Sequence, residues 1–146
     1  MATWTKFQDF SEQLVRGVHD FDAHVFKIAL TNTAPTVGQT SLDTVTNHPP
    51  PAAANGYSAG GTATTIAVSE TGGTTTVTGT QVVFTATAGG IGPFRYAILY
   101  NDTATSPADA LIAFTDYGVG GVTLADTETL TIKFNNASLG AIFTLA

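Results

Sequence analysis

The sequence contains no cysteine, little charge and no long hydrophobic run. The lack of cysteine excludes disulfide bonds, thiol catalysis and cysteine-ligated zinc or iron–sulfur sites, so burial and hydrogen bonds must stabilise the fold. Five basic residues against eleven acidic ones leave no basic cluster for a nucleic-acid backbone, and we expect no nucleic-acid partner. Apolar runs fall far short of the roughly 20 residues that cross a bilayer. Met1 to Arg16 lack the basic-then-apolar order of a signal peptide, so the sequence predicts neither membrane insertion nor export.

Threonine and glycine take the place of charged residues. Charged residues make up 11% of the chain, against roughly 25% in an average soluble domain. The 27 threonines and 15 glycines together exceed a quarter of the 146 residues, and β-branched threonine favours strands. A chain of this length forms one domain, residues 1–146, with about 7,000 Å² of exposed surface. Sixteen formal charges are sparse on that area, which predicts a component of an assembly.

The strong helical pattern of this sequence lies at the N-terminus, from Thr3 to Val18. Its apolar residues recur at spacings of three, four and seven, with polar residues between them. Gly17 is a plausible terminator. The pattern predicts one N-terminal helix within residues 1–20, whose apolar stripe packs on a sheet or on a neighbouring subunit. The stripe consists of Trp4, Phe7, Leu14, Val15 and Val18.

Beyond the helix, short segments of alternating apolar and polar residues are separated by turns that are rich in glycine. Alternation is typical of half-buried antiparallel strands, and Gly79 suggests a bulge or bend. The Pro/Gly-rich residues 38–61 predict a long irregular loop outside the core. The pattern therefore predicts an all-β fold, an antiparallel β-sandwich or jelly roll, with a closed barrel as the alternative. We expect about eight strands, at 25–31, 64–69, 74–78, 82–87, 94–100, 111–116, 129–134 and 141–145.

The corner at residues 19–24 holds a cluster of potential metal ligands: His19, Asp20, Asp22 and His24. Imidazole and carboxylate groups suit zinc or manganese, but the spacing matches no recognised zinc pattern, and acidic residues commonly cap such corners. We therefore predict no metal. The chain also lacks a Gly-x-Ser-x-Gly elbow, a P-loop and a facing pair of carboxylates, so we expect no catalytic residue, no cofactor and no enzymatic activity.

Four aromatic residues, Trp4, Tyr57, Tyr100 and Tyr117, allow two interpretations. Flat rings that are exposed can stack on the apolar faces of sugars, which would make a glycan-binding platform. Aromatic rings also anchor cores and interfaces. We favour anchoring.

Four segments of the sequence carry a resemblance to a known family. They are Lys27–Pro35 (KIALTNTAP), Asn55–Gly61 (NGYSAGG), Gly92–Asp102 (GPFRYAILYND) and Leu111–Gly118 (LIAFTDYG). In this order and spacing they resemble successive blocks of a family of small tailed-bacteriophage virion structural proteins. The resemblance spans most of the chain. Pro49 to Ala54 depart from the family pattern, and the matching blocks carry no catalytic residue.

The resemblance implies a capsid decoration (cement) or head-fibre protein. We expect a non-enzymatic protein that binds the assembled head lattice and stabilises it through many repeated contacts. Its expected partners are the major capsid protein and further copies of itself, in a dimer or trimer, on the capsid surface of a virion made in the host cytoplasm. The helix at residues 4–18 or the loop at 38–61 would dock. A tail or fibre component and a head-displayed glycan-binding adhesin remain the alternatives.

Overall fold

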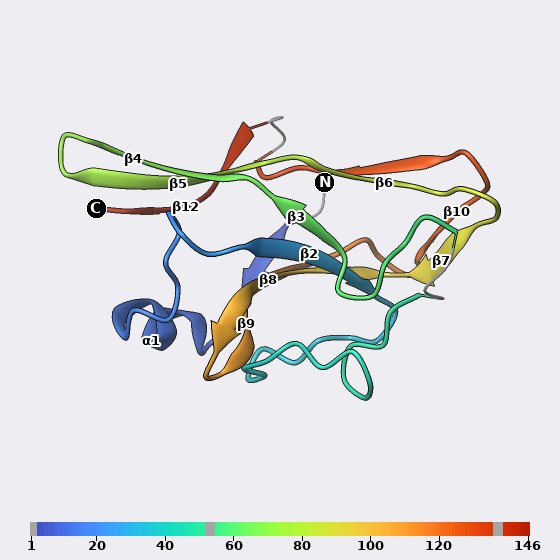
Figure 1. Cartoon of the computed structure of the whole chain (residues 1–146), viewed down its shortest axis with the longest axis horizontal. Helices are drawn as coiled ribbons and strands as arrows, with labels where there is room; N and C mark the ends of the chain where they lie inside the picture. The colour runs from blue at the N-terminus through green and yellow to red at the C-terminus, as the bar shows by residue number, and fades with distance from the viewer. Residues whose placement is uncertain (1–2, 52–54, 136–138) are drawn as a thin grey trace.

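The computed structural model describes residues 3–51, 55–135 and 139–146, which form an all-β fold with one short helix (Figure 1). All strand pairs are antiparallel. In chain order the elements are β1 (Trp4–Lys6), α1 (Phe10–Val15), β2 (Phe26–Thr31), β3 (Thr62–Thr64), β4 (Ile66–Thr71), β5 (Thr74–Thr80), β6 (Val82–Thr85), β7 (Ile91–Phe94), β8 (Tyr96–Thr105), β9 (Ala108–Asp116), β10 (Val122–Leu124), β11 (Thr129–Ile132) and β12 (Leu139–Leu145).

The strands lie in two layers. One layer is a five-stranded sheet in the order β1-β9-β8-β2-β3. The other contains the three-stranded sheet β12-β5-β4 and, further along, the β11-β6 pair, which Figure 1 shows above the first layer. The β10-β7 pair lies at the end opposite the β4-β5 turn. This arrangement confirms the predicted all-β fold with sandwich-like antiparallel sheets.

Each of the eight predicted segments overlaps a strand, and four short strands were not predicted as separate elements. These four are β1, β3, β7 and β10, of three or four residues each. Such strands are too short to show an alternating pattern in the sequence. Long-range pairing with neighbouring strands fixes them instead.

The predicted N-terminal helix is confirmed but far shorter than residues 3–18. It covers six residues, Phe10–Val15, whereas Trp4–Lys6 form β1 and pair with β9. Trp4 and Phe7 are three apart, a spacing that suits one face of a helix but opposite faces of an extended chain. Trp4 accordingly packs toward the core between the layers, while Phe7 belongs to a second cluster on the far side of the sheet.

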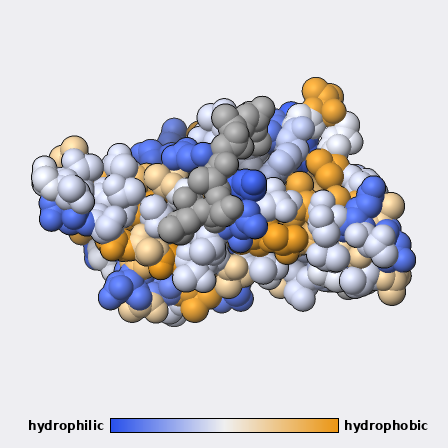
Figure 2. All heavy atoms as spheres, turned by 90° about the horizontal axis from the view of Figure 1, so that it is seen from above, coloured by the Kyte–Doolittle hydropathy of each residue, from blue (hydrophilic) through white to orange (hydrophobic). Residues whose placement is uncertain are grey.

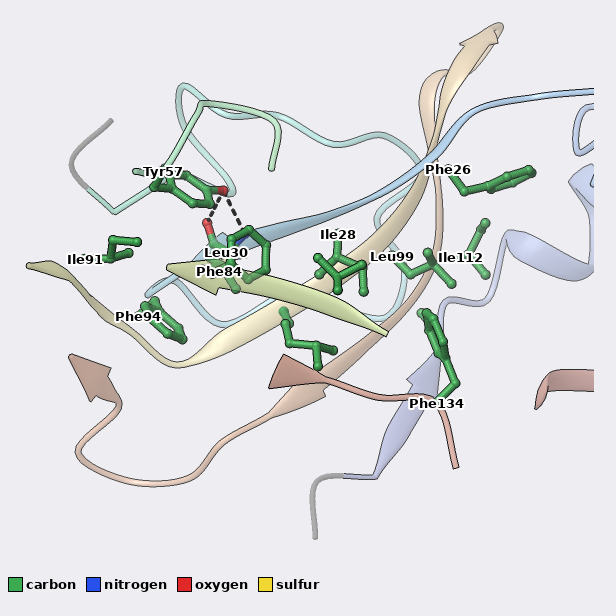
Figure 3. Packing of buried hydrophobic residues seen from close by; sticks show 14 of the residues in the cluster. Phe26, Ile28, Leu30, Tyr57, Phe84, Ile91, Phe94, Leu99, Ile112 and Phe134 are labelled. Carbon is green, nitrogen blue, oxygen red and sulfur yellow. Dashed lines mark hydrogen bonds between the residues drawn. The ribbon is translucent and has the colours of Figure 1, made fainter. Parts of the chain in front are cut away.

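The main core fills the space between the layers (Figure 3). Phe26, Ile28 and Leu30 point into it from β2, as their alternation predicts. Ile132 and Phe134 reach it from β11 and the residues that follow, and Leu130 packs at its margin. The molecule exposes 7170 Å², in agreement with the area expected for its size.

A second apolar cluster covers the outer face of the five-stranded sheet: Phe7, Ala29, Leu42, Ile98, Tyr100 and Leu111. Leu42 comes from the loop that the sequence places outside the core, so that prediction is wrong for this part of the loop. The loop is fastened to β9, because Leu42 N–H donates to Asp109 O and Leu111 N–H donates to Thr40 O, each at 3.0 Å. Residues 96–101 of β8 are consequently buried on both faces rather than half-buried.

Gly79 lies inside the continuous strand β5, and its pairing with β4 shows no bulge at that position. The irregularity lies on the neighbouring strand β12, between Ala141 and Phe143. A Cβ atom at position 79 would lie 2.7 Å from the Phe134 ring. The glycine therefore makes room for a core aromatic ring.

Candidate functional site

The candidate site lies at the corner where the chain leaves α1 and turns into β2. His19 is 5% exposed there, while Asp20 and Asp22 are exposed and His24 is half-buried. The Asp20 carboxylate accepts hydrogen bonds from the backbone N–H groups of Asp22 and Ala23, at 3.0 and 3.1 Å. It therefore caps the turn, as acidic residues at such corners commonly do.

The fully buried Asn101 of β8 holds this corner against the five-stranded sheet. Its Nδ2 lies 3.2 Å from Val18 O, 3.3 Å from His19 Nδ1 and 3.0 Å from His24 Nδ1. Its Oδ1 accepts from the N–H groups of Thr103 and Ala104, where the register of β8 shifts. The sequence offered no sign of this role, since Asn101 is 77 residues from His24.

His19 is neutral at physiological pH. Burial lowers its pKa to about 4, which His24 reinforces and Asp9 opposes. When His19 Nδ1 accepts from Asn101, the ring proton resides on Nε2. That Nε2 is buried and has no hydrogen-bond partner among the described residues. The ring packs beside Phe10 and Phe21, at 5.3 and 6.0 Å between centroids.

The corner brings the two histidines together but does not gather them with the carboxylates. His19 and His24 meet at Asn101, and the Asp20 carboxylate is occupied by the backbone of its own turn. Across the described part of the chain, no group of three or more histidine and acidic side chains is placed to hold a metal ion. The chemistry of the corner is therefore structural: it ties α1 and β2 to β8.

Beside this corner lies a cleft of about 540 Å³. One wall comes from α1 and the corner, and the other from β4, β5 and β12, so residues far apart in the sequence meet here. Sequence reasoning identified the corner but missed the cleft, because the second wall depends on long-range packing. Its lining is mainly apolar, from Leu14, Phe21, Val68, Val77, Phe143 and Leu145, with His19, Asp20, Asp22, Thr75 and Gly17.

Aromatic side chains pack against one another at the floor of the cleft. Phe21 stacks on Phe26 with centroids 4.5 Å apart and planes 5° apart, and it meets Phe143 edge-on at 5.2 Å. Phe143 also contacts Phe10 of α1 at 5.4 Å. Two of the lining side chains remain partly exposed, Val68 at 46% and Leu145 at 50%, and Val15, which follows Leu14 in α1, is 89% exposed.

The four aromatic residues do not form a sugar-binding platform, because two of them are buried. Tyr57 is 4% and Tyr100 1% exposed, whereas Trp4 and Tyr117 are half-buried at the margin of the main core. The Tyr57 hydroxyl accepts from Leu30 N–H at 2.9 Å, and the Tyr100 hydroxyl donates to Gly60 O at 2.8 Å. Core anchoring, the favoured interpretation, is confirmed for these two tyrosines.

The buried His48 of the long loop is also structural. Its Nδ1 accepts from the N–H of Asp43 at 3.1 Å, and its Nε2 lies 3.0 Å from the side-chain oxygen of Gln39. The Asp43 carboxylate accepts from Val45 and Thr46, and these hydrogen bonds lower its pKa to about 2. These bonds give the loop a fixed shape on the sheet.

Two further results bear on function. No helix among the described residues is long and apolar enough to cross a membrane. Comparisons of the chain with protein-family models, with curated proteins and with solved structures found no match.

Proposed function

We propose that the chain is a non-enzymatic structural protein of a tailed-phage virion, a capsid decoration protein that binds the assembled head lattice. The observation that carries the proposal is the apolar cleft beside α1 with its exposed rim. It is an uncovered apolar surface on a small protein that has few charges. Apolar patches with polar surroundings commonly mark interaction sites. The resemblance of four sequence blocks to phage virion proteins supplies the kind of partner.

The rest of the surface is compatible with a protein that acts through many protein–protein contacts. The described residues form three ion pairs, Glu12–Arg16, Lys27–Asp102 and Arg95–Asp116, all at least partly exposed. Figure 2 shows a face of mostly intermediate hydropathy on which hydrophobic and hydrophilic patches alternate. A threonine-rich surface of this kind costs less to desolvate than a charged one, so many weak contacts can add up when hundreds of copies cover one shell.

The docking element we propose is α1 together with the cleft. Of the two elements that the sequence suggests, the long loop uses Leu42 and His48 to cover the protein's own sheet. β1 is likewise part of a sheet. α1 differs because it carries Val15 almost fully exposed next to Leu14, which lines the cleft. A capsid segment that placed an apolar side chain in the cleft and continued along α1 would cover both residues.

The direct test is immunogold electron microscopy of virions, with antibody raised against the purified chain. Label spread over the head supports the decoration role. Label confined to the tail would replace it with the tail-component alternative. Absence of label from intact and disrupted virions alike would refute a virion role altogether.

A second test addresses the docking element. Val15→Asp places a charge on the exposed surface of α1 beside the cleft residue Leu14, and we expect it to reduce the number of copies bound per head at least severalfold. Val119→Asp is the matched control, because Val119 is 97% exposed but lies in a distant loop. Equal occupancy by both variants would remove α1 from the interface. Deletion of residues 1–18 is unsuitable, since it removes the buried Phe7 and Phe10.

A further inference from the structure

The strand β4 forms an edge of the three-stranded sheet β12-β5-β4. It pairs with β5 over all six of its residues without a register shift. Its other side pairs with no strand among the described residues. Figure 1 shows that the β4-β5 hairpin projects at one end of the molecule.

The register identifies which backbone groups of β4 face outward. Thr71 and Thr74 close the hairpin across the two-residue turn Gly72–Gly73, so this pair exchanges both backbone hydrogen bonds. Bonded and non-bonded pairs alternate along an antiparallel ladder. The N–H and C=O groups of Ile66, Val68 and Glu70 therefore point away from β5, toward the free edge.

This edge lacks the features that usually prevent strands from pairing with another chain. Protected edges are short, bulged, or carry lysine or proline. The edge strands β1 and β3 have three residues each, and β12 carries a bulge. β4 has six residues, no bulge, no lysine and no proline, and Glu70 is its one charged residue.

The side chains of the sheet also favour pairing of β4 with a further strand. Phe143, Val77 and Val68 lie side by side across β12, β5 and β4, and all three line the cleft. The row ends at the edge with Val68, which is 46% exposed. A second strand with an apolar residue opposite Val68 would continue the row and cover it.

We propose that two copies of the chain pair through antiparallel β4 strands, with the two-fold axis at Val68. The surface complements itself: Val68 faces Val68 of the second copy, and Glu70 faces Ile66 rather than the other Glu70. Each of the three outward-facing residues exchanges two backbone bonds, roughly six in total. The result is one continuous six-stranded sheet, β12-β5-β4-β4-β5-β12, crossed by an apolar row of two phenylalanines and four valines.

This inference does not depend on the virion role. It rests on the edge of β4 and on the register, and a dimer would form in the purified protein without capsid. It also commits to a dimer, where the sequence alone left dimer and trimer open. The two clefts would open on the same face of the joined sheet, because a two-fold axis between antiparallel strands is perpendicular to that sheet.

Sedimentation equilibrium of the purified chain tests the proposal. We expect twice the monomer mass of 15.0 kDa for the unmodified protein. Val68→Lys places two ammonium groups opposite each other at the axis, and we expect this variant to sediment as a monomer with unchanged circular dichroism. Val83→Lys is the matched control, since Val83 is 44% exposed on a strand of another sheet, and should stay dimeric. A monomeric or trimeric unmodified protein, or a Val68→Lys dimer, would overturn the proposal.

Cross-linking provides a readout that does not require the lysine variant to fold. The chain has no cysteine, so Val68→Cys introduces a single thiol. Directly opposed residues in a hydrogen-bonded antiparallel pair have Cα atoms about 5.5 Å apart, which suits a disulfide. Mild oxidation should link Val68→Cys into a covalent dimer within minutes and leave Val83→Cys monomeric. Equal cross-linking of both variants would show that the link forms by random collision.

Discussion

Threonine side chains donate hydrogen bonds to backbone carbonyl groups of other segments. The Thr31 hydroxyl donates to Pro49 O at 2.8 Å, Thr64 donates to Thr80 O at 2.8 Å, and Thr78 donates to Ala67 O at 3.2 Å. Each of these bonds joins segments that are at least 11 residues apart. The abundance of threonine therefore does more than favour strands, because its hydroxyls connect neighbouring elements without adding charge.

At His19 we predict acid sensitivity. Its pKa of about 4 in the folded chain lies below the ordinary 6.5, so the unfolded chain binds the proton more tightly. The stability that comes from neutral His19 is fully present above pH 6.5. As the pH falls toward 4, the free energy of unfolding decreases by up to about 3 kcal/mol. Urea unfolding between pH 4 and 7 measures this.

His19→Phe keeps an aromatic ring beside Phe10 and Phe21 but cannot titrate. We expect its free energy of unfolding to fall less steeply over the same pH range, with His48 and the carboxylates contributing equally to both proteins. Identical pH slopes for the two proteins would contradict the assignment.

Gly61 is a position where a methyl group should be tolerated poorly. Its φ is +79°, and a Cβ atom there would lie 1.8 Å from Ile28 O in β2. We expect Gly61→Ala to destabilise the fold by about 3 kcal/mol or more, since the backbone of a central strand must move. Gly120→Ala, at φ +100° with open space around it, should cost only about 1 kcal/mol. Thermal unfolding of both variants decides the matter, and equal losses would contradict the steric argument.

At the scale of elements, Tyr57 continues the sheet where β3 ends. β3 pairs with β2 only from Phe26 to Ile28. Beyond it, the Tyr57 hydroxyl accepts from Leu30 N–H and donates to Leu30 O, as the dashed lines in Figure 3 show. One side chain thereby occupies the place of a fourth strand residue.

We therefore predict that Tyr57→Phe destabilises the fold by about 1 to 3 kcal/mol, because it leaves a buried N–H group unsatisfied. Tyr117→Phe is the control, since the Tyr117 hydroxyl makes no hydrogen bond to the described residues, and it should change stability by less than about 0.5 kcal/mol. Chemical denaturation gives both values. A similar loss of stability in the two variants would mean that the hydrogen bonds of the Tyr57 hydroxyl do not stabilise the fold.

Most strands could be predicted from the sequence because alternation over five or more residues is a local signal. The extent of the N-terminal helix could not, since the spacing of Trp4 and Phe7 indicates one face of a helix, whereas the extended chain places them on opposite faces of the sheet. The burial of Leu42 and the cleft beside His19 were also out of reach, because each depends on contacts between distant segments. The role of the four aromatic residues could not be decided from the sequence, because only the structure shows that Tyr57 and Tyr100 are buried and cannot belong to an exposed platform.

At the scale of the whole molecule, the two apolar clusters share the five-stranded sheet. Ala97 and Leu99 of β8 belong to the main core, whereas Ile98 belongs to the cluster under the long loop. Neither cluster can come apart without exposing the other side of the same strands. We therefore predict one cooperative unfolding transition.

Trp4 makes this measurable, because it is the one tryptophan of the chain. It lies on β1 in the five-stranded sheet and stacks on Phe134 of the opposite layer, at 5.3 Å between centroids. Its fluorescence therefore reports contact between the layers, and far-ultraviolet circular dichroism reports the strands. We expect coincident midpoints in urea. Separate midpoints would show that the layers part before the sheets melt.

The double burial of β8 has a consequence for how the sequence can change over time. A strand with one solvent-exposed face accepts polar substitutions at every second position, but residues 96–101 of β8 are all buried and offer no such position. The exposed strand β4 can vary far more freely, apart from any constraint at its edge. The sequences of related chains should therefore differ most in exposed strands such as β4 and least in β8. Distant relatives are best recognised by similarity in the short segment from Tyr96 to Asn101.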